Sequence, residues 1–137
     1  DRGGRATRGE VPAGLTAATG LVSTVRDLSR FDIALDRGDL VRPDLLAIAW
    51  QNVVTSSGAP LPTGLGWFVQ NYNGERLVWH FGYVPGAGSS LIIKVPGRDM
   101  TLIMLANSDG LGQFSSLTDG DITSSLFAKL FLRLFVG

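Results

Sequence analysis

Hydrophobic side chains recur every three or four residues between positions 24 and 38, which is the spacing of one face of a helix. The residues that share this face are Val25, Leu28, Phe31 and Leu35. Thr24 stands where an N-cap is needed, and Asp27 follows three residues later at capping-box spacing. Gly38 suits a helix stop. The pattern predicts an amphipathic helix that begins after Thr24 and ends before Gly38.

Two further helices are predicted. Pro43 suits a first helical turn, and the apolar residues after it predict a short helix from Pro43 to about Trp50. A long helix is predicted over residues 118–136. Its predicted apolar face consists of Leu126, Phe127, Leu130, Phe131, Leu134 and Phe135. Because this helix carries only two positive charges, packing on a sheet is favoured over binding to a membrane surface.

Between these helices the pattern becomes typical of strands. The runs "GLGWFVQNY" and "ERLVWHFG" flank Asn73-Gly74, a strong signal for a two-residue hairpin turn. Counting outward from that turn places Trp67 opposite His80. The register therefore predicts these two side chains next to each other on one face of the sheet.

A second hairpin is predicted from "SSLIIKV" and "MTLIMLAN", which flank "PGRD". We expect a type II′ turn centred on Gly97-Arg98, because that turn needs glycine first. The strand runs are almost continuously apolar, which indicates that both faces of the sheet are covered. The predicted fold class is α+β, with an antiparallel sheet of two consecutive hairpins flanked by helices.

Composition narrows the function classes. The 137 residues are 45% hydrophobic and 18% charged, which suits one globular unit. Twelve basic residues balance twelve acidic ones, so a nucleic-acid partner is not expected. The chain has no cysteine and one histidine, which excludes thiolate chemistry and argues against a metal site. No apolar run has the length of a transmembrane helix. No cofactor is implied.

We expect a single segment over residues 1–137. An extended, glycine- and arginine-rich segment covers 1–19, helices occupy 20–50, the two hairpins occupy 64–107, and the last helix occupies 118–136. Because the first residue is aspartate and not methionine, we expect the segment to come from a longer protein.

His80 is the one residue whose position calls for a functional explanation. It lies in an apolar strand between Trp79 and Phe81 and is followed at once by a glycine-rich bend. A lone histidine in a strand either fills the core or faces a ligand. Ser89 and Ser90 follow on the next strand, but a serine nucleophile needs a base, and His80 is the only one nearby.

The order of several motifs resembles a known superfamily. "GLVSTVRDLSRF" is followed by "GLGWFV", by "HFGYVPGAGSSLIIKVPGRDMTLIMLANSDG", and by a final apolar helix. This order, over about residues 14–136, resembles the C-terminal part of the serine β-lactamase and penicillin-binding-protein superfamily. Its nearest branch is the group of class C β-lactamases, D-alanyl-D-alanine carboxypeptidases and esterases. The resemblance implies a partial β-lactamase/transpeptidase-like fold.

The resemblance also implies roles for individual residues. In the family a K-T-G or H-x-G triplet borders the active site, and His80, Phe81 and Gly82 match it. The imidazole would face the catalytic cleft, and Gly82 would let the acyl group come close. The backbone N–H of Tyr83 would be an oxyanion-hole donor, a group worth roughly 3 kcal/mol in the transition state. Phe81 and Trp67 would contact the substrate.

The chain departs from the family in lacking a nucleophile motif. Leu91 and Leu126 stand three residues before the two lysines, so there is no S-x-x-K, and neither tyrosine begins a Y-x-N. In the family both motifs lie upstream of the part seen here. We therefore expect the C-terminal part of a serine hydrolase, inactive alone, whose partner is the N-terminal part of the same enzyme.

The expected substrate is a small molecule or peptide: a β-lactam, a D-alanyl peptide or an ester, hydrolysed through an acyl-enzyme. The family is usually periplasmic or secreted, and the sequence itself leaves the compartment open. The alternative hypothesis is a non-catalytic binding or dimerisation module, because an exposed sheet edge can pair with a second copy to form a homodimer.

Overall fold

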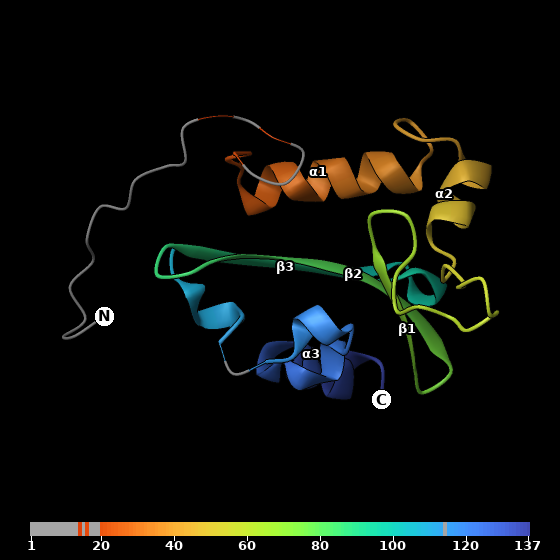
Figure 1. Cartoon of the computed structure of the whole chain (residues 1–137). Helices are drawn as coiled ribbons and strands as arrows, with labels where there is room; N and C mark the ends of the chain where they lie inside the picture. Colours follow the sequence, from red (N-terminus) through yellow and green to blue (C-terminus); the bar gives the residue numbers. More distant parts are fainter. Residues whose placement is uncertain (1–13, 15, 17–19, 114) are drawn as a thin grey trace.

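The computed structural model describes residues 14, 16, 20–113 and 115–137, in three layers (Figure 1). A four-stranded sheet lies between α1 on one face and α3 on the other. The helices are α1 (Val25–Asp36), α2 (Pro43–Ala49) and α3 (Leu126–Phe135), and the strands are β1 (Phe68–Tyr72), β2 (Glu75–Val84), β3 (Gly88–Val95) and β4 (Met100–Ala106). The expected α+β class is confirmed. The predicted N-terminal segment, 1–19, lies almost wholly outside the described residues.

None of the described helices has the length and apolar character needed to cross a membrane.

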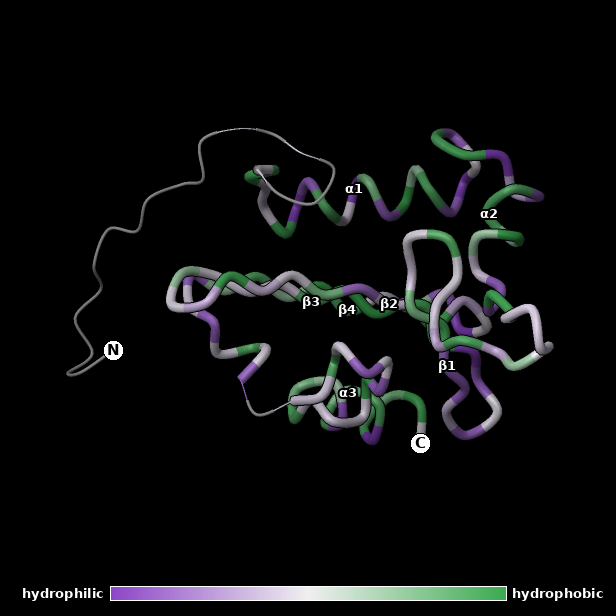
Figure 2. The backbone as a smooth tube through the Cα atoms, in the orientation of Figure 1, coloured by the Kyte–Doolittle hydropathy of each residue, from purple (hydrophilic) through white to green (hydrophobic). Residues whose placement is uncertain are grey.

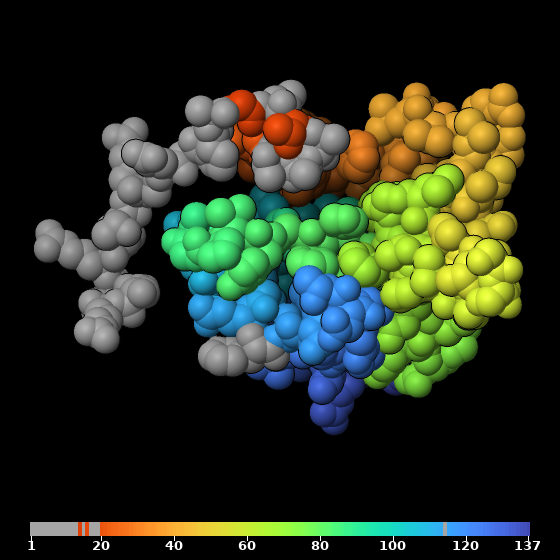
Figure 3. Space-filling view, in the orientation of Figure 1, coloured from red at the N-terminus to blue at the C-terminus, as the bar shows by residue number. Residues whose placement is uncertain are grey.

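The segment between α2 and β1, drawn in yellow, forms one end of the molecule beside β1 (Figure 3).

The sheet is antiparallel throughout, in the order β1-β2-β3-β4. The predicted first hairpin is confirmed, because Tyr72 pairs with Glu75 across the turn. Asn73 and Gly74 have φ angles of 48° and 83°. Two consecutive positive φ angles are what a type I′ turn requires, which explains the Asn-Gly pair. The last pair of this ladder is Phe68 with Trp79.

The turn predicted for the second hairpin is wrong. Val95 pairs with Met100, so four residues form the connection in place of two. Pro96–Arg98 make a 3₁₀ turn, and the left-handed residue is Asp99, with φ 49°, and not Gly97. Proline holds φ near −65°, which suits the first position of a type I-like turn, and aspartate tolerates the left-handed conformation better than most residues.

Helix α1 begins and ends where the sequence predicts. The Thr24 side chain accepts a hydrogen bond from the Asp27 N–H at 3.1 Å, and Gly38 follows the helix with φ 78°. The predicted apolar face is only partly buried, however. Leu35 is buried, whereas Phe31 remains 45% exposed. Hydrophilic and hydrophobic residues, in purple and green, alternate along α1 in Figure 2. The buried residues of α1 are Asp32 and Leu35.

The prediction for the C-terminal helix is wrong at its start and in its buried face. Residues 117–124 form two 3₁₀ turns, and the α-helix begins only after Ser125, whose hydroxyl caps it. Of the six residues predicted on the apolar face, only Phe131 is buried. The residues of this segment that do face the core are Ala128, Phe131, Leu132 and Val136. The segment is apolar on nearly all sides, so periodicity alone does not select the packed face.

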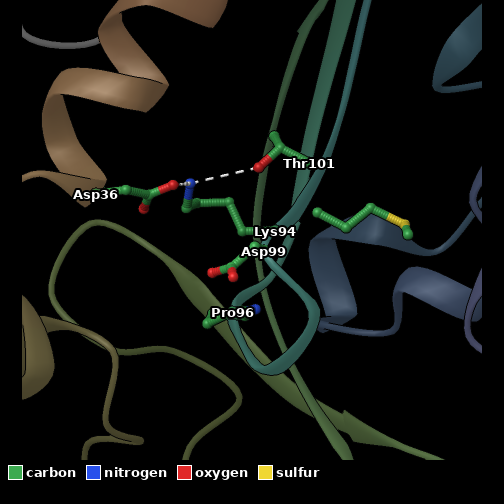
Figure 4. A pocket seen from close by; sticks show the side chains of 6 residues that line it. Asp36, Lys94, Pro96, Asp99 and Thr101 are labelled. Atoms are coloured by element: carbon green, nitrogen blue, oxygen red, sulfur yellow. Dashed lines mark hydrogen bonds and ion pairs between the residues drawn. The ribbon is translucent and has the colours of Figure 1, made fainter.

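Lys94 connects the sheet to α1 from inside the protein (Figure 4). Its side chain is 2% exposed, and its ammonium group pairs with Asp32 and, at 2.9 Å, with Asp36. The same nitrogen lies 3.4 Å from the Thr101 hydroxyl and 5.9 Å from the centroid of the Trp50 ring. A hollow of about 180 Å³ lies beside this ion pair. Buried lysine needs such partners because an unpaired buried charge is strongly unfavourable.

On the opposite face, Asp121 connects the segment before α3 to β1. The Gln70 side chain donates to its carboxylate at 3.1 Å and accepts from the Ile122 N–H at 2.9 Å. The Thr123 hydroxyl bond lowers the pKa of Asp121 from its usual value, burial opposes this, and the Gln70 bond lowers the pKa further. The stability gained from these contacts is present at neutral pH and is lost as the pH falls through the lowered pKa.

Removing the buried ammonium group should destabilise the fold strongly. Lys94→Ala leaves Asp32 buried without its cation, and we expect a loss of about 3–5 kcal/mol in the free energy of unfolding, measured by urea denaturation. Lys129→Ala, on the exposed face of α3, is the matched control and should change it by less than about 0.5 kcal/mol.

The double variant Lys94→Met with Asp32→Leu distinguishes the cost of leaving the Asp32 carboxylate unpaired from the cost of losing the Lys94–Asp32 contact. Apolar replacement of both members of a buried ion pair is close to neutral, so this variant should recover most of the loss. A single Lys94→Ala variant as stable as the wild type would contradict the role given to the ion pair.

Candidate functional site

A groove of about 290 Å³ lies between α1 and the sheet. We call it the His80 groove. Its wall on the helix side consists of Leu28 and Phe31, and its sheet side consists of Trp67, His80, Phe81, Gly82, Ser90, Leu91, Ile92, Ile103 and Leu105. It lies beside the first and middle turns of α1, where Phe31 remains 45% exposed, and the Lys94 ion pair with Asp32 and Asp36 lies further toward the C-terminal end of the helix.

His80 lies in the groove and is exposed. Side chains alternate between the two faces of a strand, so His80 and Gly82 share the face toward α1, while the buried Trp79 faces α3. The His80 ring lies 5.9 Å from the Phe68 ring, centroid to centroid. The imidazole is therefore accessible to a ligand and is not a core side chain.

Gly82 permits a close approach to the neighbouring strand. It pairs with Ser90 on β3, and a Cβ atom built on Gly82 would lie 2.5 Å from the Ser90 hydroxyl oxygen. That separation is far inside the contact distance of carbon and oxygen. Glycine therefore leaves the Ser90 hydroxyl free to lie over the strand, next to His80 in the groove.

The backbone of Tyr83 faces an unpaired edge of β2. The tight turn makes Tyr72 and Glu75 a hydrogen-bonded pair, so odd-numbered residues of β2 direct their N–H and C=O groups toward β1. The Val69 N–H bonds to Pro62, away from β2, as this alternation requires. Because β1 ends opposite Trp79, no described strand pairs with Phe81 or Tyr83 on that side.

The Tyr83 and Phe81 rings lie on the face opposite the groove. A Cβ atom on Gly112 would lie 2.6 Å from the Tyr83 ring, so the ring packs directly over that glycine. The Phe81 ring packs with Phe68 and Trp79, at centroid distances of 5.9 and 6.2 Å, against the α3-side core. Phe81 is among the groove-lining residues, but its ring is directed into this aromatic cluster.

Trp67 lies one residue before β1 and lines the same groove as His80. Its ring meets the Trp50 ring edge-on at 6.4 Å. The structure therefore brings together Trp67, His80 and Gly82, with the Tyr83 amide at the adjoining strand edge.

Sequence patterns identify Ser90 as a hydroxyl on the strand next to His80, but they do not identify the rest of the groove wall. Ser90, Ile103 and Leu105 line it from β3 and β4, and Leu28 and Phe31 line it from α1. The alternation of side chains between the two faces of each predicted strand could have identified Ser90, Ile103 and Leu105, because each lies on the same face of the sheet as His80. The helix residues were predicted to be core, because periodicity gives the inward face but not how closely that face packs.

The hydroxyl and ammonium groups near the groove differ in their availability. Ser89 is engaged, since its hydroxyl donates to the Ser108 carbonyl at 2.6 Å and accepts from the Leu111 N–H at 3.1 Å. Lys94 is held by two carboxylates. Among the described residues, no group of three or more histidine, cysteine or acidic side chains is arranged to hold a metal ion. The groove offers an imidazole and one serine hydroxyl, and the amide edge at Tyr83 adjoins it.

The contact between Gly82 and Ser90 predicts a specific coupling between two substitutions. Gly82→Ala alone should destabilise the chain by roughly 1–3 kcal/mol, because its methyl group collides with the Ser90 hydroxyl. Ser90→Ala removes that oxygen, and the Ser90 Cβ lies 3.8 Å from the added atom, an ordinary contact. The double variant should therefore be more stable than Gly82→Ala, as measured by urea unfolding. Simple additivity of the two changes would contradict the contact.

Comparison with known proteins shows the family to which the chain belongs. The model of the family described as beta-lactamase matches residues 1–123, which include α1 and the whole sheet. The comparisons with curated proteins and with solved structures found no match. The match covers well over half of the chain, and it contains the strand that carries His80 and Gly82. The chain belongs to the beta-lactamase family.

Proposed function

We propose that this chain forms one wall of the acyl-transfer cleft of a serine hydrolase. The branch that its motifs favour is that of class C β-lactamases, D-alanyl-D-alanine carboxypeptidases and esterases. The observation that carries the proposal is the juxtaposition of an accessible His80 with the unpaired strand edge at Tyr83. The attacking serine would come from an S-x-x-K segment outside this sequence, because this chain has none.

Each residue has a distinct role in this proposal. The Tyr83 N–H donates a hydrogen bond to the oxygen that becomes negative as the acyl carbon turns tetrahedral. Gly82 keeps the strand surface low, so that the acyl group can lie against it. His80 orients the substrate from the groove side and is a candidate proton-transfer group. Trp67 contacts the substrate, and Phe81 holds the strand in place through its ring.

The missing nucleophile has a consequence that two substrates test on the chain itself. Incubation with nitrocefin and with p-nitrophenyl acetate should give no hydrolysis above the buffer rate. Turnover by the purified chain that disappears in Ser90→Ala would contradict the proposal and make Ser90 the nucleophile.

The oxyanion role is tested by Tyr83→Pro, which deletes the N–H. In an enzyme that joins this chain to an S-x-x-K segment, kcat/KM should fall by about 10²–10³. Tyr83→Ala keeps the amide and, like the proline variant, removes the ring that packs over Gly112, so it is the matched control and is expected near the wild-type rate. Proline is tolerated on a free strand edge, so both variants should fold, as followed by circular dichroism. Unchanged kcat/KM in a folded Tyr83→Pro variant would exclude the oxyanion role.

A second candidate function is dimerisation through the sheet. The unpaired half of β2 and the edge strand β4 both offer backbone groups to another strand. If two copies pair along β2, sedimentation at rising concentration should show a dimer, and Tyr83→Pro should shift it to monomer. A wild-type chain that stays monomeric at high concentration would contradict this candidate.

A further inference from the structure

The His80 groove is lined mainly by hydrocarbon. Its walls are formed by Leu28 and Phe31 on one side and by Trp67, Ile92, Ile103 and Leu105 on the other. The polar groups, His80 and Ser90, lie on the two central strands β2 and β3. A ligand here would place a polar carbonyl near those groups and an apolar body against the remaining walls.

No lysine or arginine is among the described residues that line the groove. His80 is the only titratable side chain among the described residues that line it. Lys94, the next residue along β3 on the same face after Ile92, is buried and neutralised by Asp32 and Asp36. A carboxylate moved into an apolar groove without a cation loses its hydration and gains no ion pair in return.

The size of the groove limits the apolar group. At about 290 Å³ it lies just below the range for small-molecule sites, roughly 300–1,000 Å³. A short acyl chain or a single aromatic ring fits this volume, and a long lipid chain does not.

We infer that the His80 groove selects a neutral, apolar acyl or aryl group and disfavours a carboxylate. This inference rests on the proposed function and names its substrate class: an uncharged ester or amide, in preference to a β-lactam or D-alanyl peptide whose carboxylate would have to lie in this groove. Selectivity arises from the absence of a free cation in the wall, and not from a shape that excludes the carboxylate.

The test compares two probes that share one apolar body. Methyl 4-phenylbutyrate and 4-phenylbutyrate are titrated into the isotope-labelled chain, and NMR follows the methyl signals of Leu28, Ile103 and Leu105. We expect the ester to bind at least tenfold more tightly and to shift these signals. Equal affinity, tighter binding of the carboxylate, or no shift with either probe would overturn the inference.

Matched variants locate the effect in the groove. Phe31→Ala should weaken ester binding severalfold, whereas Ile33→Ala, an equally exposed residue of α1 outside the groove, should not. Leu105→Lys adds a cation at a partly exposed position of the wall and should strengthen carboxylate binding by about fivefold. Failure of Leu105→Lys to favour the carboxylate would count against a charge-based selectivity.

The outcomes separate this inference from the proposed function. Tyr83→Pro removes the oxyanion donor but leaves the groove wall intact, so it should not change the ratio of the two affinities. A lost ester preference together with a Tyr83-dependent reaction would refute the inference alone. A retained preference with a reaction indifferent to Tyr83 would refute the proposed function alone.

Discussion

The buried ion pair of Lys94 with Asp32 and Asp36 determines where α1 lies over the sheet. Leu35 is the only apolar side chain of α1 that is buried, and the charged contact joins the same part of the helix to β3. It acts at the C-terminal half of the helix. Leu28 and Phe31, nearer the N-terminus of the helix than the two carboxylates, line the His80 groove.

The second constraint is the unequal length of neighbouring strands. β1 has five residues and β2 has ten, so the part of β2 that carries His80, Gly82 and Tyr83 has a strand on one side only. Alternation then sends side chains and backbone groups in different directions. The imidazole enters the groove, the Tyr83 N–H points along the sheet plane, and the aromatic rings turn to the core beside α3. One strand thus presents an imidazole to the groove and an amide to the adjoining sheet edge.

Two glycines keep this strand close to its neighbours. Gly82 lets the Ser90 hydroxyl approach from β3, and Gly112 lets the Tyr83 ring pack from the opposite face. Both contacts lie at the unpaired end of β2, where fewer ladder hydrogen bonds hold the chain. Close packing around a strand edge makes the edge rigid while leaving its amides accessible, which is what a preorganised hydrogen-bond donor needs.

The sequence by itself determined the local elements and the register near the first turn. Helix periodicity and the Thr24 cap gave α1, and Asn73-Gly74 fixed the pairing of β1 with β2, because turn chemistry and side-chain period act over a few residues. It also carried the motif order that relates the chain to its family. Only the tertiary structure decided which face of α3 is buried and how the second turn closes. It also decided that Lys94 meets Asp32 across 62 residues and that α1 and the sheet enclose the groove, because no local pattern encodes contacts between such distant positions.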